Sequence, residues 1–310
     1  MKTAFLYAGQ GSQKPGMGLD FYNAHPTFRD IFDSAQVSFD LKEVCFEDSE
    51  NRLSDTRFVQ PCMVAFAAGV TRLLFDAGAV PDYVAGLSLG EYSALCAAGV
   101  WDARDAIRIA ERRGQAMHDA AVGIDCAMVA VLKLSREDLQ QACDEASSCG
   151  VVEIANYNCP GQLVIAGEAA AVGIAAELAK AAGARCMPLK TSGPFHTSLL
   201  APAAETLEQY FKTISFGEMQ IPVLFNTFGD LMGQKCPISE ILQKQVCSSV
   251  YMEDIIRRLS DLGVTKIVEI GPGAVLSGFV RKTVPEIQTC AINTCADFEA
   301  ALSFIKEDTL

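Results

Sequence analysis

The pentapeptide Gly86-Leu87-Ser88-Leu89-Gly90 has the spacing G-x-S-x-G. This spacing is typical of a sharp strand-to-helix turn that lifts a serine hydroxyl out of a sheet, where a base can take its proton. The pattern also arises by chance. Here its context fits, because residues 83–85 read as a short buried strand and residues 93–98 as a helix of small residues. A side chain at either glycine would collide across so tight a turn, and we predict that Ser88 is a nucleophile.

A nucleophilic serine needs a general base, and the chain offers three histidines, His25, His118 and His196. His25 precedes a proline in a polar segment and is expected at the start of a helix. His118 is expected to end a helix over residues 105–118, a position that favours a cation. His196 lies in a loop between two predicted elements, where loops line clefts. Its position makes His196 the best candidate base, although a structural role is an equally good interpretation.

Two adjacent arginines in that predicted helix differ in the direction in which they point. Residues 106, 107, 110, 114 and 117 form one apolar stripe at about 100° per residue. Arg113 lies within about 60° of the centre of this stripe, whereas Arg112 points about 160° away from it. An arginine at the edge of a buried stripe needs an anionic partner, which either the protein or a ligand can supply. Gly114 would let such a ligand approach the helix closely.

The loop Ala8-Gly9-Gln10-Gly11-Ser12-Gln13 follows the first predicted strand, residues 3–8. It is not a phosphate-binding loop, because its spacing is not G-x-G-x-x-G and no G-K-[ST] follows. A glycine-flanked loop at the end of a strand can instead present backbone N–H groups to an oxyanion. The loop is therefore a candidate oxyanion-binding segment.

The elements that hold these residues indicate an α/β fold. Strands and helices alternate to about residue 123, and the pattern resumes after residue 190. The segment between reads β-α-β-β-α-β, the ferredoxin-like order, with a turn expected at Asn158-Cys159-Pro160-Gly161. We predict a hydrolase-like main domain with a mostly parallel sheet (residues 1–124 and 191–310) and an inserted ferredoxin-like subdomain (residues 125–190). The remaining predicted elements are helices at 198–211, 238–246, 252–262 and 275–282 and strands at 223–226 and 266–270.

Composition narrows the class of protein. Half of the 310 residues are apolar and a fifth are charged, which is ordinary for a globular enzyme. The net charge of −13 disfavours nucleic acid and anionic membranes as partners. The twelve cysteines are scattered and form no C-x-x-C pair, and there are only three histidines, so we predict no metal site. Free thiols without a signal peptide point to the cytoplasm. We expect no membrane span, because Arg72 and Asp76 interrupt the most apolar stretch.

Six ordered segments together resemble a known family. They are Gly9-Gln10-Gly11-Ser12-Gln13, Gly86-Leu87-Ser88-Leu89-Gly90-Glu91-Tyr92, Arg113-Gly114, Asn156-Tyr157-Asn158-x-Pro160-Gly161-Gln162, Gly193-Pro194-Phe195-His196 and Glu269-Ile270-Gly271-Pro272-Gly273. In this order they resemble the malonyl-CoA:acyl-carrier-protein transacylases of bacterial type II fatty acid synthesis. The resemblance covers essentially the whole chain and is far more specific than the serine turn alone.

The resemblance implies a reaction and a set of roles. It implies ping-pong transfer of a malonyl group from malonyl-CoA, through a malonyl-Ser88 ester, to the phosphopantetheine thiol of acyl carrier protein, with no cofactor. The implied roles are Ser88 as nucleophile, His196 as general base and then acid, the Gln10 and Leu89 N–H groups as oxyanion hole, Arg113 as ligand of the malonyl carboxylate, the Gln245 carbonyl as the group that orients His196, and Asn158 and Gln60 as pocket-lining residues.

Three positions bear on how closely the chain follows that family. Leu87 stands where the family usually has histidine, which puts fine acyl preference in doubt, and Ala8 replaces a common proline. Phe195 resembles the malonyl-selecting form of its motif.

An acidic carrier protein is expected to dock on local basic residues, and we expect a monomer. The candidate docking residues are Arg281 and Lys282 first, then Arg185 and Lys190.

Three other interpretations remain open from the sequence. An acyltransferase that serves a polyketide synthase would share the fold and the chemistry. A serine hydrolase would share the serine turn, but Arg113 and the inserted subdomain argue against it. An inactive relative that serves as a binding module would not need Ser88, His196 and Arg113 together.

Overall fold

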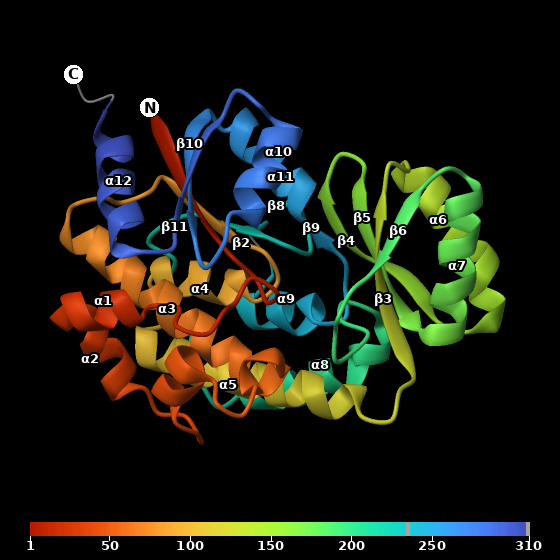
Figure 1. The fold of residues 1–310 in the computed structure, drawn as a ribbon, viewed down its shortest axis with the longest axis horizontal. Helices are drawn as coiled ribbons and strands as arrows, with labels where there is room; N and C mark the ends of the chain where they lie inside the picture. The colour runs from red at the N-terminus through yellow and green to blue at the C-terminus, as the bar shows by residue number, and fades with distance from the viewer. Residues whose placement is uncertain (234–235, 308–310) are drawn as a thin grey trace.

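The computed structural model of the protein describes residues 1–233 and 236–307 and shows a mixed α/β fold with two sheets, which confirms the predicted class (Figure 1). The first sheet has six strands in the order β11-β10-β1-β2-β7-β8, and the second has five in the order β6-β3-β5-β4-β9. In Figure 1 the second sheet lies at the right of the molecule, with helices α6 and α7 beyond it.

The first sheet brings the chemistry-bearing loops to one edge. Strand β1 (Lys2–Tyr7) pairs in parallel with both β2 (Tyr83–Gly86) and β10 (Val264–Ile270), and its last residue Tyr7 stands opposite Gly86 and Ile270. Parallel strands end at a common edge, which is where ligands bind in such sheets. Strand β7 (Val223–Phe225) continues the parallel sheet beside β2, and β11 (Gln288–Ile292) continues it beside β10. Two strands of this sheet were not predicted: β11, and β8 (Asp230–Leu231), which is antiparallel to β7.

Helices cover both faces of the first sheet because side chains alternate along each buried strand. From β1, Phe5 and Tyr7 join the core beneath helices such as α3 and α5, whereas Ala4 and Leu6 pack toward α10 and α11 (Figure 1). The helices of this part of the chain are α1 (Leu19–Ala24), α2 (Pro26–Ser34), α3 (Thr56–Asp76), α4 (Gly90–Ala97), α5 (Ala103–Ala121), α8 (Ala201–Phe211), α9 (Ile238–Gln245), α10 (Met252–Asp261), α11 (Val275–Thr283) and α12 (Cys295–Lys306).

Helix α3 contradicts the reason for which we expected no membrane span, since Arg72 and Asp76 do not keep its composition below that of a span. The helix is 21 residues long, and an 18-residue window within it has a mean hydropathy of 1.5, so by length and composition it could cross a membrane despite Arg72 and Asp76. However, 83% of that window is buried inside the protein. The helix is apolar because it forms the centre of the core, where it contacts α5 and α2.

The second sheet contains the predicted β-α-β-β-α-β order of elements. They are β3 (Cys126–Leu132), α6 (Arg136–Ala146), β4 (Val152–Cys159), β5 (Gln162–Glu168), α7 (Ala169–Ala181) and β6 (Arg185–Pro188). Neighbouring strands among these four are antiparallel, and α6 and α7 pack on one face of the sheet around residues such as Ile154 and Ile165.

The boundaries of these elements differ from the prediction at two places. Asn158 and Cys159 belong to β4, so that only Pro160 and Gly161 form the turn. Strand β9 (Val250–Tyr251), from far along the chain, pairs in parallel with β4 and extends the second sheet. Val250 is fully buried, so β9 is held beside β4 by contacts between residues far apart in the chain, which leave no local sequence signal.

Candidate active site

Ser88 lies in the turn between β2 and α4, as the G-x-S-x-G spacing predicts. Its φ of 53° is in the left-handed region, which non-glycine residues rarely adopt. The two glycines have no room for a side chain. A Cβ at Gly86 would lie 2.0 Å from the Gly90 carbonyl carbon, and a Cβ at Gly90 would lie 2.1 Å from the Tyr7 carbonyl oxygen. The turn is therefore too tight for any residue but glycine at both positions.

His196 is the histidine that the fold brings to the serine. Its Nε2 lies 2.7 Å from Ser88 Oγ, and its Nδ1 lies 2.9 Å from the Gln245 carbonyl oxygen and 3.1 Å from that of Ser248. Because Nδ1 faces two carbonyl acceptors, it carries the ring proton, and Nε2 is left to accept the Ser88 O–H. The Gln245 carbonyl thus has the position that the resemblance implies, whereas the Ser248 carbonyl was not anticipated.

The surroundings of His196 keep its ring neutral. Burial, followed by the positive charge of Arg113, lowers the pKa of His196 to about 4, and the two carbonyl acceptors only partly offset this. A neutral imidazole at physiological pH is the form that can accept a proton from a serine hydroxyl.

Arg113 is buried at the edge of the cavity, with 1% of its surface exposed, whereas Arg112 is exposed, as the helical periodicity predicts. Its Nη2 donates to Ser88 Oγ at 3.1 Å and to Gln245 Oε1 at 3.0 Å. Its Nη1 donates to Gln60 Oε1 at 2.9 Å. No carboxylate of the described residues lies within ion-pair distance of the guanidinium, so a ligand carboxylate has no resident competitor at that distance.

Gln60 corrects a prediction. It was expected to line the pocket, but it does not appear among the lining residues and is fully buried. Its Oε1 accepts from Arg113 and its Nε2 donates to Thr56 Oγ1 at 2.8 Å. Gln60 therefore supports Arg113 from behind, because a buried guanidinium needs acceptors for its N–H groups.

Two further buried side chains shape the electrostatics around Arg113. The guanidinium carbon lies 5.1 Å from the centre of the Tyr92 ring, in cation–π geometry. Burial raises the pKa of the Glu91 carboxyl to about 8, although the Asn226 N–H and the charge of Arg113 oppose the increase. The site therefore combines one buried positive charge with a carboxyl that burial tends to keep protonated.

A cavity of about 760 Å³ opens in front of Ser88, His196 and Arg113. Asn158 lines it as predicted, and Gln10, Leu87 and Phe195 line it as well. Its walls come from both sheets: the loop after β1, the serine turn and α11 belong to the first, while β3, β4 and β5 belong to the second. The additional lining residues include Met117, Met128, Asn156, Val164, Lys190 and Phe279.

The predicted oxyanion donors lie on two segments that touch. A Cβ at Gly9 would lie 2.5 Å from the Leu87 carbonyl oxygen, so the loop after β1 approaches the serine turn closely. The Gln10 side chain is fixed by a 2.9 Å hydrogen bond from Thr56 Oγ1. Within the described part of the chain, the backbone N–H groups of Gln10 and Leu89 have no acceptor, which leaves both able to bind one.

Of the remaining candidates, only Lys190 lines the cavity. His25 precedes α2 as its N-cap, and His118 lies 4.0 Å from Asp55. Arg281, Lys282 and Arg185 are exposed, and Lys190 is exposed and lines the cavity. Lys282 donates to Gln162 at 3.1 Å, and Arg281 donates to Thr289 at 3.3 Å. Neither side chain forms an ion pair with another described residue.

Sequence reasoning missed Asn226, whose side chain bonds to the serine turn at Gly86 and Ser88. It also missed the side chain of Gln245, which contacts both Arg113 and the Ser88 carbonyl. The position of Asn226 at the carboxyl end of a predicted parallel strand was a usable signal, because functional polar residues gather there. No local pattern marks the role of the Gln245 side chain.

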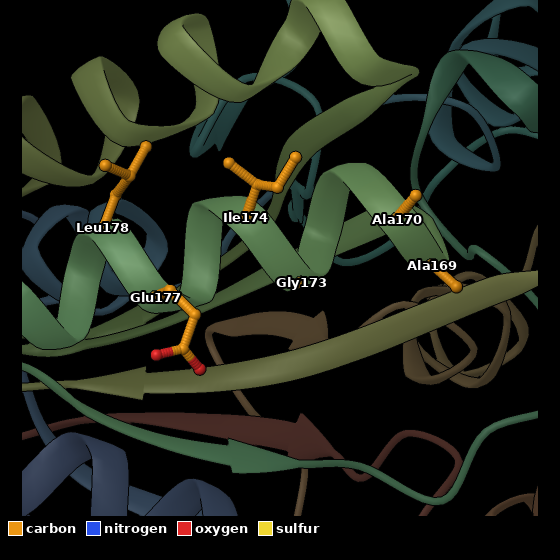
Figure 2. Close-up of a pocket in the computed structure, with 6 residues that line it drawn as sticks. All are labelled: Ala169, Ala170, Gly173, Ile174, Glu177 and Leu178. Carbon is orange, nitrogen blue, oxygen red and sulfur yellow. The ribbon is translucent and has the colours of Figure 1, made fainter.

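Neither a hollow on α7 nor a cluster of metal-binding side chains forms a rival site in the described residues. A shallow hollow lies on α7, where Ile174 and Leu178 project from the helix and Glu177 points to its other side (Figure 2). It shares no residue with the cavity at Ser88 and presents no pair of reactive groups. Over residues 1–233 and 236–307, no group of three or more His, Cys, Asp or Glu side chains is arranged to hold a metal ion.

Known proteins resemble this chain in both sequence and structure. The acyl transferase domain family matches residues 4–298. The malonyl CoA-acyl carrier protein transacylase of Bacillus subtilis (strain 168) is 40% identical over 311 residues, which cover 99% of this chain and 98% of that protein. The crystal structure of malonyl CoA-acyl carrier protein transacylase from Clostridium perfringens Atcc 13124 has a TM-score of 0.95 at 36% identity and covers 99% of this chain and 98% of its own. A malonyl-transacylase in complex with its type II PKS acyl-carrier protein has a TM-score of 0.94 at 36% identity and covers 98% and 100%.

Proposed function

Because the chain belongs to the acyl transferase family, we propose that it transfers a malonyl group from malonyl-CoA to the phosphopantetheine thiol of an acyl carrier protein. Relatives that match nearly its whole length carry the name of that activity. The observation that carries the proposal is the position of Ser88 Oγ, which lies 2.7 Å from the base His196 and 3.1 Å from the buried cation Arg113. A nucleophile between a base and a carboxylate-binding group fits an acyl donor that carries a free carboxylate.

The reaction proceeds in two half-reactions through an ester. Ser88 Oγ attacks the malonyl thioester carbonyl while His196 Nε2 takes its proton, and the coenzyme A thiolate leaves and receives that proton. The carrier thiol then attacks the malonyl-Ser88 ester by the reverse steps. The Gln245 and Ser248 carbonyls hold His196 in the required tautomer, which is the task of the carboxylate in a Ser-His-Asp triad.

The tetrahedral oxyanion is bound by the N–H groups of Gln10 and Leu89. Each such donor contributes about 3 kcal/mol to transition-state stabilisation in comparable sites. What supports this assignment is that both N–H groups lack an acceptor in the described structure and lie on segments in contact with each other.

Substrate choice is made in the cavity between the two parts of the fold. Arg113 takes the malonyl carboxylate as a bidentate partner, and Phe195 limits the space beside it. Asn158 lines the cavity from β4 and contacts the bound substrate.

We assign residues 1–124 and 191–310 to a hydrolase-like domain and residues 125–190 to a ferredoxin-like subdomain, from the strand order of the second sheet. The substrate binds between them, where the ester is shielded from water.

The partner is an acidic carrier protein that docks on exposed basic residues near the cavity, first Arg281 and Lys282. The protein acts as a monomer, without a cofactor, in the reducing cytoplasm, where its twelve unpaired cysteines remain thiols. A carrier from a polyketide pathway is the second candidate partner, because one similar structure is a malonyl-transacylase bound to a type II PKS acyl-carrier protein.

Mass spectrometry of the intact protein tests the proposal. After mixing with malonyl-CoA, the wild type should gain one malonyl group and lose it again when holo acyl carrier protein is added. Ser88→Ala should gain none. Hydrolysis of malonyl-CoA by the wild type without a carrier, at the rate of transfer, would indicate a serine hydrolase instead.

A further inference from the structure

We propose that Asn226 is a positioning residue for the nucleophile, whose carboxamide clamps Gly86 and Ser88 and so holds the Ser88 backbone in its left-handed conformation. This inference rests on the proposed function, because it takes Ser88 as the attacking group. Asn226 follows β7, the strand beside β2, and is fully buried.

The contacts of Asn226 tie the serine turn to the end of β7, to α4 and to β9. Its Oδ1 accepts the Ser88 N–H at 2.6 Å, and its Nδ2 donates to the Gly86 carbonyl oxygen at 2.6 Å. Its own N–H donates to Glu91 Oε2 at 2.6 Å, and its carbonyl oxygen accepts the Tyr251 N–H at 3.0 Å. Both ends of the side chain and both backbone polar groups are therefore bonded, which fixes the carboxamide in place.

The serine turn needs such a clamp because its backbone conformation is unfavourable. A left-handed conformation is unfavourable for a non-glycine residue, and it persists only where the surroundings over-determine it. At Ser88 the N–H is held by Asn226, and the carbonyl oxygen accepts from Gln245 Nε2 at 2.9 Å. Side chains from two distant segments thus fix the peptide groups on both sides of the nucleophile.

The clamp also decides which N–H groups can bind the oxyanion. Because Asn226 Oδ1 occupies the Ser88 N–H, that donor is not available to a tetrahedral intermediate. The Leu89 and Gln10 N–H groups remain. Asn226 therefore fixes the peptide between Leu87 and Ser88, while Gln245 holds the next peptide, which carries the Leu89 N–H, through the Ser88 carbonyl oxygen.

Asparagine suits this task better than other residues of its size. A carboxamide offers an acceptor and a donor on one short planar group, whereas a carboxylate offers acceptors only. Asn226 does not line the cavity, and its side chain bonds to the serine turn and not to Arg113. We therefore expect it to touch neither the acyl group nor the group that binds the acyl carboxylate. Its loss should therefore slow attack by Ser88 without weakening substrate binding.

Phenylmethanesulfonyl fluoride provides a probe that needs Ser88 but no carboxylate site. Ser88 Oγ attacks sulfur, the S–F bond breaks, fluoride leaves, and His196 receives the proton. Intact-mass kinetics should show Asn226→Ala labelled about 100-fold more slowly than wild type, as expected for a misplaced reacting group. Malonyl adduct formation should slow by a similar factor. The dissociation constant of malonyl-CoA, measured in the Ser88→Ala background with and without Asn226→Ala, should stay within twofold.

Thr71→Val is the matched control, because it also removes a buried hydrogen bond, the 3.0 Å contact with Tyr7, without touching the serine turn. It should be labelled at the wild-type rate. If Asn226→Ala does not fold, Asn226→Ser serves instead, with at least tenfold slower labelling expected. Labelling of the Asn226 variant within twofold of wild type, or a loss of affinity as large as the loss of rate, would overturn the inference alone. A wild type that is not labelled at Ser88 would overturn the proposed function and this inference with it.

Discussion

Around the Ser88 hydroxyl, the side chains fix one another's positions through hydrogen bonds. Gln245 shows this most clearly, because it bonds to His196 through its carbonyl oxygen, to Arg113 through Oε1 and to Ser88 through Nε2. Desolvating a guanidinium is costly, and here Gln60, Gln245 and the Tyr92 ring offset part of that cost with neutral groups. The positive charge is therefore rigid and has no anionic partner at contact distance among the described residues, so it can select an anionic ligand.

We expect Arg113→Ala to lower kcat/KM for malonyl-CoA about 100-fold, because a desolvated carboxylate loses its charged partner. The gap between malonyl-CoA and acetyl-CoA should narrow, since acetyl-CoA no longer leaves a buried charge unpaired. Steady-state transfer rates with both donors measure this. Arg112→Ala is the control, because its side chain is exposed on the same helix, and it should behave as wild type. If acetyl-CoA remained as poor a donor for the Arg113 variant as for wild type, the carboxylate role would be wrong.

The low pKa of His196 predicts an unusual pH profile. Labelling of Ser88 by the sulfonyl fluoride should stay constant down to about pH 5 and fall near pH 4, because the pKa of His196 is lowered to about 4. Removing the charge in Arg113→Ala should move this fall to higher pH. A wild-type fall centred near 6.5, the ordinary pKa of histidine, would contradict the burial argument.

The same shift has a consequence for stability. Because the pKa of His196 is lower in the folded than in the unfolded state, the unfolded chain binds more protons between about pH 6.5 and pH 4. The contribution of His196 to the free energy of unfolding is therefore retained above this window and falls by roughly 3 kcal/mol as the pH falls through it. Urea unfolding of wild type and His196→Ala at pH 7 and pH 5 would reveal the difference.

At the scale of elements, the site depends on strands that end together. Strands β1, β2, β7 and β10 are parallel neighbours, so the loops and turns at their carboxyl ends meet. Glycines allow these segments to touch. Gly90 approaches the end of β1, and Gly271 approaches Ala8 so closely that a Cβ added at Gly271 would lie 2.4 Å from the Ala8 Cβ. The positions of Ser88 and the Gln10 loop are thus set by backbone contacts between strands.

Gly90→Ala should disable the serine turn, because its Cβ would lie 2.1 Å from the Tyr7 carbonyl oxygen. We expect a decrease of several kcal/mol in the free energy of unfolding and loss of Ser88 labelling. Gly278→Ala in α11 is the matched control. Its nearest contact would be Arg281 Nη2 at 4.0 Å, and alanine in a helix should stabilise by up to about 1 kcal/mol. Thermal unfolding of both variants decides between these expectations, and equal melting temperatures would refute the steric argument.

The whole molecule forms the cavity by joining its two sheets. Strand β9 pairs with β4, Ser249 Oγ donates to the Ile154 carbonyl at 2.6 Å, and Arg136 on α6 bonds to Asp254 on α10 at 2.8 Å. These contacts couple the part that carries Ser88 to the part that carries Asn158. The net charge of −13 makes the few exposed basic clusters the natural contacts for an acidic partner.

Charge reversal tests the docking site for the carrier. Arg281→Glu with Lys282→Glu should raise KM for the acyl carrier protein at least tenfold, because both residues are exposed at the end of α11 and like charges would repel an acidic partner. Loading of Ser88 by malonyl-CoA should not change. Arg108→Glu, an exposed site on α5, should leave KM for the carrier unchanged. A carrier KM that is insensitive to the double reversal would place docking elsewhere.

The sequence by itself determined the α/β class, the strand-to-helix turn at Ser88, the inward direction of Arg113 and most element positions, because these follow from local periodicity and glycine spacing. It also nominated His196 over His25 and His118, although residue types alone left its role open. Only the tertiary structure brought Asn226, Ser248 and the Gln245 side chain to the site, moved Gln60 behind Arg113 and joined β9 to the second sheet. Those features depend on contacts between residues far apart in the chain, which no local pattern encodes.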